Sequence, residues 1–132
     1  MPCLRGAQLV QEIFEENESE ILYGAIIWTP ILATDNLDAA NQREIKFLDP
    51  RVKQFWDPAQ ALGRLLSQTL NLKASIAWDV YLVYPPYHSL DTDLPPAPKL
   101  WMHQLDEEPN LLLDPDRLKQ YVQTLLERTA FL

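Results

Sequence analysis

The sequence predicts an α/β fold in which helices cover both faces of a mixed sheet. Segments with strand character alternate with segments of helical periodicity along the 132 residues, an order typical of parallel sheets. The stretch 75–84 is rich in β-branched and aromatic residues, ends at Pro85 and is apolar on both faces. A strand that is apolar on both faces is covered on both, which places it inside a helix–sheet–helix sandwich.

Length and composition predict one domain, residues 1–132, with its own hydrophobic core. The formal charge of −8 argues against DNA, RNA or an anionic membrane as partners, because their phosphates would be repelled. No apolar run approaches the ~20 residues that span a bilayer, and no secretory leader is visible. We therefore expect a cytoplasmic protein, provided that Met1 is the true start. One cysteine excludes an internal disulfide, and we expect neither a metal nor another cofactor.

The chain opens with a predicted helix over residues 5–17, in which Leu9 and Ile13 fall four residues apart on an apolar stripe. Glutamates crowd its far end, where the helix dipole disfavours negative charge, so they are expected to stop the helix and form a solvated surface. The apolar run 21–28 is the first predicted strand, and Pro30 ends or bends it.

Capping residues at 34–36 introduce a second predicted helix over 37–48. Residues 52–56 then predict a short strand. Polar Lys53 and Gln54 interrupt it, which favours a place at the edge of the sheet.

The third predicted helix starts at Asp57-Pro58-Ala59-Gln60. Asp57 is the expected cap, Pro58 occupies the first helical position, and Gln60 completes a spacing like that of a capping box. Its buried face is expected to consist of leucines: Leu62, Leu65, Leu66 and Leu70.

Beyond the strand at 75–84 lies a loop over 85–98 with five prolines, which cannot pair as sheet. Residues 99–105 predict a returning strand and hence an antiparallel hairpin. The last helix opens with Asp114 as its cap and Pro115 at its first position.

Two stretches carry a family resemblance. Residues 55–64, Phe-Trp-Asp-Pro-Ala-Gln-Ala-Leu-Gly-Arg, look like the step from strand through Asp-Pro to helix in redoxins. Residues 1–6, Met-Pro-Cys-Leu-Arg-Gly, look like the second half of a Cys-x-Pro-Cys motif running into the redox helix. Together with the order of elements, they resemble the thioredoxin-like superfamily, in the branch of redoxins and thiol-disulfide oxidoreductases. The resemblance covers nearly the whole chain and implies a three-layer α/β/α sandwich with a mixed sheet.

The sequence departs from that family in three ways. The strand before the motif is missing, the first cysteine is missing, and residues 76–78 hold no counterpart of the family's cis-proline. In this fold the missing strand would lie between the strands at 21–28 and 75–84. Its loss leaves two apolar strand edges that must pair directly, capture another chain or stay open, so a homodimer through an exposed edge is expected as one outcome.

The resemblance assigns Cys3 and Asp79 as the candidate catalytic residues. A thiol at a helix N-terminus beside Arg5 is expected to be partly ionised and able to form mixed disulfides with protein thiols. By position Cys3 matches the family's second, resolving cysteine, and alone it cannot complete a disulfide-exchange cycle within one chain. Asp79 would tune that thiol or accept its proton. The alternatives are an exposed thiol without a role, and an aspartate that is purely structural.

Other chemistry finds little support in the sequence. His88 and His103 show no metal-ligand spacing, and His103 is expected to be a packed or half-exposed strand residue. Asp91 and Asp93 predict a solvated loop rather than a cation site. Three glycines leave no glycine-rich phosphate loop.

Three functional hypotheses follow. The chain is a thioredoxin-like protein derived from a thiol-disulfide redox protein, with Cys3 as its remaining thiol, and is an oxidoreductase if its N-terminus is incomplete. Alternatively it is a thioredoxin-fold module without catalytic activity that binds another protein. A third alternative is an unrelated α/β protein that binds a small ligand in a pocket away from Cys3.

Overall fold

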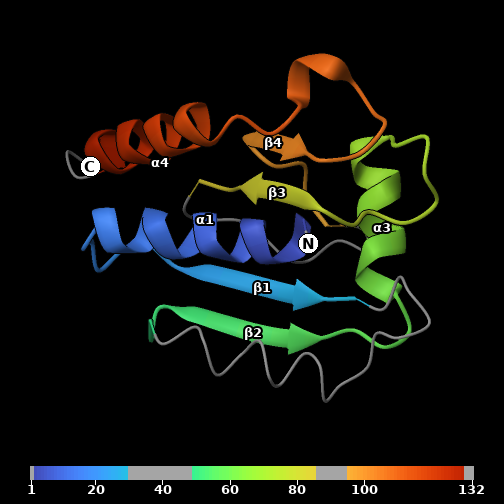
Figure 1. Ribbon diagram of the computed structural model, residues 1–132, viewed down its shortest axis with the longest axis horizontal. Helices are drawn as coiled ribbons and strands as arrows, with labels where there is room; N and C mark the ends of the chain where they lie inside the picture. The colour runs from blue at the N-terminus through green and yellow to red at the C-terminus, as the bar shows by residue number, and fades with distance from the viewer. Residues whose placement is uncertain (1, 30–48, 86–94, 130–132) are drawn as a thin grey trace.

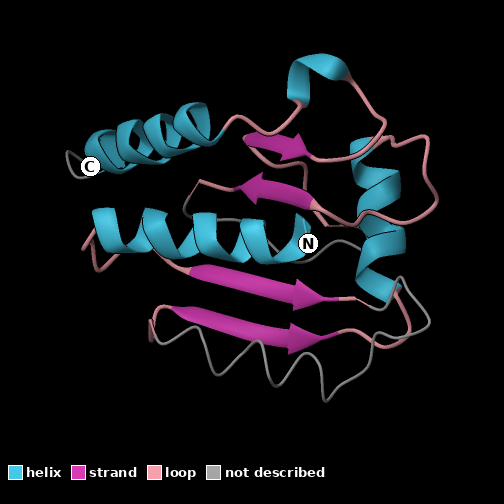
Figure 2. Cartoon of the chain, in the orientation of Figure 1, coloured by secondary structure: helices cyan, strands magenta, loops and turns pink. Residues whose placement is uncertain are grey.

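The computed structural model describes residues 2–29, 49–85 and 95–129, and the description below concerns these residues. They form a mixed α/β structure with helices and two small sheets (Figures 1 and 2). The elements in chain order are α1 (Pro2–Glu16), β1 (Gly24–Trp28), β2 (Val52–Trp56), α3 (Ala61–Leu70), β3 (Val80–Val83), β4 (Leu100–His103), the 3₁₀ turn η1 (Pro109–Leu111) and α4 (Pro115–Thr129). The predicted helix at 37–48 lies outside the described residues.

The four described strands form two separate pairs. β1 and β2 are parallel, in register from Gly24 opposite Val52 to Trp28 opposite Trp56. β3 and β4 are antiparallel, from Val80 opposite His103 to Val83 opposite Leu100. Among the described strands β1 does not pair with β3, and the two run in opposite directions (Figure 1).

One hydrophobic core joins both pairs of strands to α1 and α4. Its buried members are Leu9, Ile13 and Phe14 of α1, Val52 of β2, Met102 of β4, and Leu118 and Val122 of α4. Ile26 of β1 and Val83 of β3 pack against this core. The helix stripe that contains Leu9 and Ile13 is therefore confirmed, and α1 and α4 cover the same face of the two pairs of strands.

Gly24 fixes how closely α1 approaches the parallel strands. A Cβ atom at this position would lie 2.9 Å from Cζ of Phe14 and 3.3 Å from Cγ2 of Val52. The absence of a side chain at the start of β1 therefore lets the aromatic ring of α1 pack directly on the strand backbone.

The predicted strand at 75–84 is wrong over its first half, because only Val80–Val83 is a strand. Three contacts fix the preceding residues in an irregular path. The Ala77 N–H donates to the Gly63 carbonyl of α3 at 2.8 Å, the Glu107 carboxylate accepts from main-chain N–H groups of residues 73 and 74, and Asp79 has φ of 51°. A left-handed residue ends an extended strand, so the strand cannot begin before Val80.

Other predicted elements agree with the structure to different degrees. The strand at 52–56 is confirmed residue for residue, and α4 begins at Pro115 as expected, with the Asp114 carboxylate accepting from the Arg117 N–H at 3.2 Å. The Asp57 carboxylate accepts from the Ala61 and Leu62 N–H groups at the start of α3, at 3.2 and 2.9 Å, but the cap residue of the helix is Gln60 and not Asp57. The helix itself starts at Ala61 rather than at residue 58. The remaining described elements differ from the predicted ranges at their ends.

Candidate functional site

The candidate site lies at the amino end of α1. The amino end of this helix, the carboxyl ends of β1 and β2 and the start of β3 all point toward the same side of the molecule (Figure 1). Cys3 is the second residue of α1, in the turn whose main-chain N–H groups have no partner within the helix. The side chains of residues 2–5 lie outside the described residues, so the position of the thiol stays a prediction.

Gly6 sets the distance between the start of α1 and β3. A Cβ atom on Gly6 would clash with the hydroxyl oxygen of Tyr81 and lie 3.0 Å from its ring carbon Cζ. The Tyr81 hydroxyl donates to Oε1 of Gln104 at 2.9 Å, which fixes the ring against the segment that follows β4. The amino end of α1 is therefore packed on β3, one helical turn after Cys3.

Asp79 directly precedes β3 and is two residues from Tyr81. It is half-buried, with φ of 51°, and its carbonyl accepts from the Gln104 N–H at 3.0 Å. The sequence placed Asp79 within a long strand, whereas the structure places it in the bend before a short one. Because Tyr81 contacts Gly6, Asp79 and the start of α1 lie on the same side of the molecule. The separation of the Asp79 carboxylate from the Cys3 thiol stays a prediction.

Two tryptophans near this region differ in exposure. Trp28, at the end of β1, is buried, and its Nε1–H donates to Oε1 of Gln54 at 2.8 Å. Trp78, next to Asp79, is 38% exposed. One indole of this region is therefore part of the buried core, and the other is open to solvent.

His103 is a structural residue of the core, as the sequence predicted. Its side chain is fully buried, Nδ1 accepts from the Leu105 N–H at 3.0 Å, and Nε2 lies 2.8 Å from the Glu108 carbonyl oxygen. A ring whose Nδ1 accepts carries its proton on Nε2, which donates to that carbonyl. His103 therefore holds the turn that follows β4. His88, Asp91 and Asp93 lie outside the described residues.

Neither a metal site nor a membrane span is found in the described part of the chain. No group of three or more His, Cys, Asp or Glu side chains in ranges 2–29, 49–85 and 95–129 is placed to hold a metal ion. None of the described helices is long and apolar enough to cross a membrane.

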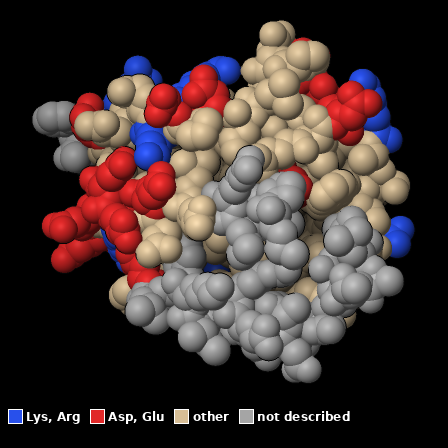
Figure 3. Space-filling model, viewed as in Figure 1, with Lys and Arg blue, Asp and Glu red and all other residues tan. Residues whose placement is uncertain are grey.

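Acidic side chains gather at the opposite end of α1 (Figure 3). The exposed glutamates there are Glu12, Glu15, Glu16, Glu18 and Glu20. Lys119 of α4 reaches this cluster, with Nζ 2.9 Å from a Glu12 carboxylate oxygen and 3.3 Å from one of Glu16. The hydrogen bonds that Lys119 donates to these carboxylates, to Glu12 first, raise the pKa of Lys119. The cluster is mainly a solvated surface, as the sequence predicted, and its contact with Lys119 of α4 was not predicted.

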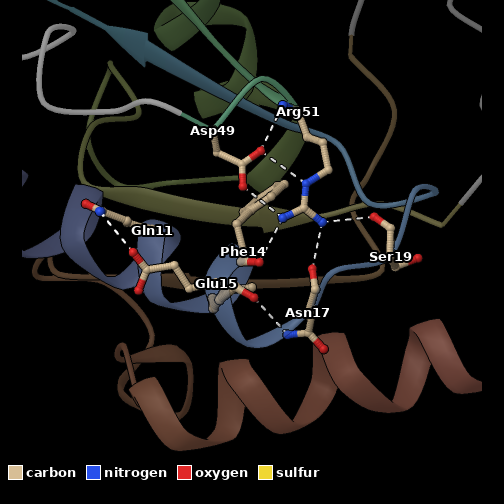
Figure 4. Close-up of polar contacts among 8 residues, drawn as sticks. Gln11, Phe14, Glu15, Asn17, Ser19, Asp49 and Arg51 are labelled. Carbon is tan, nitrogen blue, oxygen red and sulfur yellow. Dashed lines mark hydrogen bonds and ion pairs between the residues drawn. The ribbon is translucent and has the colours of Figure 1, made fainter.

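Arg51 is a structural residue that the sequence analysis missed (Figure 4). Nη1 donates to the carbonyls of Asn17 and Ser19 at 2.6 and 2.9 Å, and Nη2 donates to that of Phe14 at 2.8 Å. Nε and Nη2 also bind the two carboxylate oxygens of Asp49, at 3.1 and 2.8 Å. The guanidinium carbon lies 4.7 Å from the centre of the Phe14 ring. A cation on these carbonyls satisfies the carboxyl end of α1.

Glu107 plays a comparable part beside α3. Its two carboxylate oxygens accept from the main-chain N–H groups of Lys73 and Ala74, each at 3.0 Å. These hydrogen bonds lower the pKa of Glu107, and the one from Lys73 has the larger effect. The hydrogen bond from Arg51 likewise lowers the pKa of Asp49. Glu107 joins two segments more than thirty residues apart, and Asp49 binds Arg51, which joins two others. No local pattern in the sequence marks these contacts.

The comparisons with known proteins do not assign a family. No protein-family model matches the chain, and neither the curated proteins nor the solved structures contain a significant match.

Proposed function

We propose that this chain is a thioredoxin-like thiol protein in which Cys3 forms mixed disulfides with a partner protein. The observation that carries the proposal is the break between β1 and β3. The family resemblance predicts a missing strand between these two, and the described strands leave them unpaired. The parallel pair, the antiparallel hairpin and a helix that packs on both are compatible with a mixed α/β fold of this kind.

The chemistry follows from the place of Cys3 in the first turn of α1. The positive end of a helix dipole and unpaired N–H groups favour a thiolate over a thiol. The sulfur of Cys3 attacks one sulfur of a partner's disulfide, and the other sulfur leaves as a thiolate. Because the chain has one cysteine, a low-molecular-weight thiol must attack the mixed disulfide, and Cys3 leaves as a thiolate again.

The single cysteine makes the proposal easy to test. Dithiobis(nitrobenzoate), an aromatic disulfide, releases a coloured thiolate when a thiol attacks it, so every signal reports on Cys3. We expect the folded chain to react at pH 7 about tenfold faster than the urea-unfolded chain. The Cys3→Ser variant has no thiol and is the negative control. An equal or slower rate in the folded chain would contradict the proposal.

Asp79→Asn is the matched variant for the second candidate residue. Asn tolerates the left-handed backbone found at this position, so the fold is expected to be kept. If Asp79 accepts the thiol proton, the rate of Cys3 at pH 7 falls about threefold. An unchanged rate, with unchanged stability, assigns Asp79 a purely structural role.

A protein-binding module without catalysis is the second candidate function. The edges of β1 and β3 with which none of the described strands pairs favour it, because strand edges readily pair with another chain. It predicts that Cys3→Ser leaves partner binding unchanged, whereas the thiol proposal predicts loss of the covalent complex.

A further inference from the structure

The segment that follows β4, residues 104–108, is bonded to the start of β3. The Gln104 N–H donates to the Asp79 carbonyl at 3.0 Å, and Oε1 of Gln104 accepts from the Tyr81 hydroxyl at 2.9 Å. That hydroxyl oxygen is the atom that a Cβ on Gly6 would meet. We call residues 104–108 the β4 turn. This turn fixes the bend before β3 and, through Tyr81, the packing of β3 on the amino end of α1.

The β4 turn also holds the segment between α3 and β3. The two carboxylate oxygens of buried Glu107 accept from the main-chain N–H groups of Lys73 and Ala74, each at 3.0 Å. Because the hydrogen bonds from Lys73 and then Ala74 lower the pKa of Glu107, its carboxylate stays ionised at every pH above its ordinary value of 4.5. A change in this region between pH 7.5 and pH 5 therefore does not come from Glu107.

One buried side chain determines the shape of the β4 turn. His103 has no exposed surface, its Nδ1 accepts from the Leu105 N–H at 3.0 Å, and its Nε2 lies 2.8 Å from the Glu108 carbonyl oxygen. The neutral ring with its proton on Nε2 satisfies both contacts. A protonated ring carries an N–H group on each nitrogen. Its Nδ1–H would therefore point at the Leu105 N–H, and two buried donors would lose their partners.

Glu107 is the buried charged group that faces the His103 ring. A charge on the ring lowers the pKa of Glu107, so the two side chains interact electrostatically, and the carboxylate favours the charged ring in return. Val80, which lies opposite His103 on β3, is uncharged. The other charged residues of the β4 turn and of the described segments around it are exposed to solvent: Arg64, Lys73, Asp106, Glu108, Asp114, Asp116 and Arg117. Proton uptake by His103 therefore sets one favourable charge contact against two lost hydrogen bonds.

We propose that the β4 turn is a pH-sensitive latch on the start of β3, which opens when His103 takes up a proton from solvent. At neutral pH the uncharged ring binds the Leu105 N–H, and the turn stays closed. The charged ring is more stable in the open turn, where water reaches Nδ1. Because the open turn binds one proton more than the closed turn, opening becomes easier as the pH falls. The proposal goes beyond the thiol chemistry and does not require Cys3.

Nuclear magnetic resonance of the full chain labelled with ¹⁵N tests the latch. The ring ¹⁵N signals of His103 report its protonation, and each amide exchange rate is compared with that of an unstructured peptide at the same pH. Between pH 7.5 and pH 5 we expect the ring to become charged. In the same range the protection of the Gln104, Leu105 and Lys73 amides should fall at least about tenfold. The protection of the Gly24 amide, in the other pair of strands, should stay unchanged.

His103→Asn is the matched variant, because its side-chain oxygen can accept in place of Nδ1 and its amide does not titrate. Protection of the β4 turn should then be equal at both pH values. His88→Asn, which removes the other histidine, should keep the full pH dependence. If His103→Asn fails to fold, the signals of the unchanged chain still decide.

Five outcomes would overturn the proposal. In the unchanged chain they are a His103 ring that stays neutral down to pH 5, a ring that becomes charged while the Leu105 amide stays protected, a loss of protection while the ring is neutral, and an equal loss at Gly24. In the variants, the fifth is the same pH dependence in folded His103→Asn as in the unchanged chain.

Discussion

At its carboxyl end α1 meets a charged anchor, whereas at its amino end it meets a single aromatic ring. Arg51 binds three carbonyls at the carboxyl end and stacks over Phe14. At the amino end, Gly6 allows Tyr81 to pack against the helix backbone. The carboxyl end of the helix is therefore held by more polar contacts than the amino end, which is where the proposed thiol chemistry lies.

Of the changes at the two ends of α1, replacing Arg51 is expected to lower the free energy of unfolding most. Arg51→Met removes the partners of the Phe14, Asn17 and Ser19 carbonyls, and we expect it to lower the free energy of unfolding by about 2–3 kcal/mol. Arg51→Lys keeps the charge but loses the planar fork, so it should recover less than half of that loss. Urea unfolding measures both. Full stability of the Lys variant would show that charge alone anchors the helix.

Adding a side chain at Gly6, at the amino end of α1, is expected to lower the free energy of unfolding by less. In Gly6→Ala the new Cβ forces the Tyr81 hydroxyl to move, and we expect a loss of about 1–2 kcal/mol in spite of the better helix propensity of Ala. Tyr81→Phe removes the clashing oxygen, so the two changes should be coupled in a double-mutant cycle. Additive effects in urea unfolding would mean that the ring does not hold this end of α1.

Low pH should weaken the hydrogen bonds that Asp49 and Glu107 accept. The loss in free energy of unfolding is expected to be smaller than for the substitutions above. The folded state lowers the pKa of Asp49 and of Glu107 below their ordinary values of 3.8 and 4.5. Their contribution to stability is thus fully present above those values and is lost as pH falls through the lower folded-state pKa. Unfolding curves between pH 6 and pH 2 measure it. Glu107→Gln should flatten its share of the decline, and an unchanged curve would contradict this account.

The sequence predicted the elements that depend on local signals. The strand at 52–56 and the start of α4 at Pro115 follow from neighbouring residues and are confirmed. Asp57 accepts hydrogen bonds from the start of α3, but the helix begins three residues later than predicted, with Gln60 as its cap residue. The strand at 75–84 has equally strong local character, but contacts with Gly63 and Glu107 override it in residues 73–77. Such contacts join parts of the chain that periodicity cannot bring together.

The candidate site was predictable only in part for the same reason. The sequence placed Cys3 just before a helix over residues 5–17, whereas the structure begins α1 at Pro2 and so places Cys3 in its first turn. Asp79 lies beside the start of β3, but its left-handed backbone depends on the turn in which it sits. Arg51 follows Asp49 by two residues, a local pair that gives no sign of the α1 carbonyls more than thirty residues earlier.

The central claim is that the Cys3 side chain lies close to Asp79 at the amino end of α1 and far from Arg51 at the carboxyl end. Because the chain has one thiol, a label on Cys3 tests this claim directly. A nitroxide attached to Cys3 broadens nearby amide signals in the ¹⁵N spectrum, and α1, with 15 residues, is about 22 Å long. We predict strong broadening of Asp79 and Val80 and little of Ser19 and Arg51. Sharp signals for Asp79 and Val80, or equal broadening at both ends, would contradict the account.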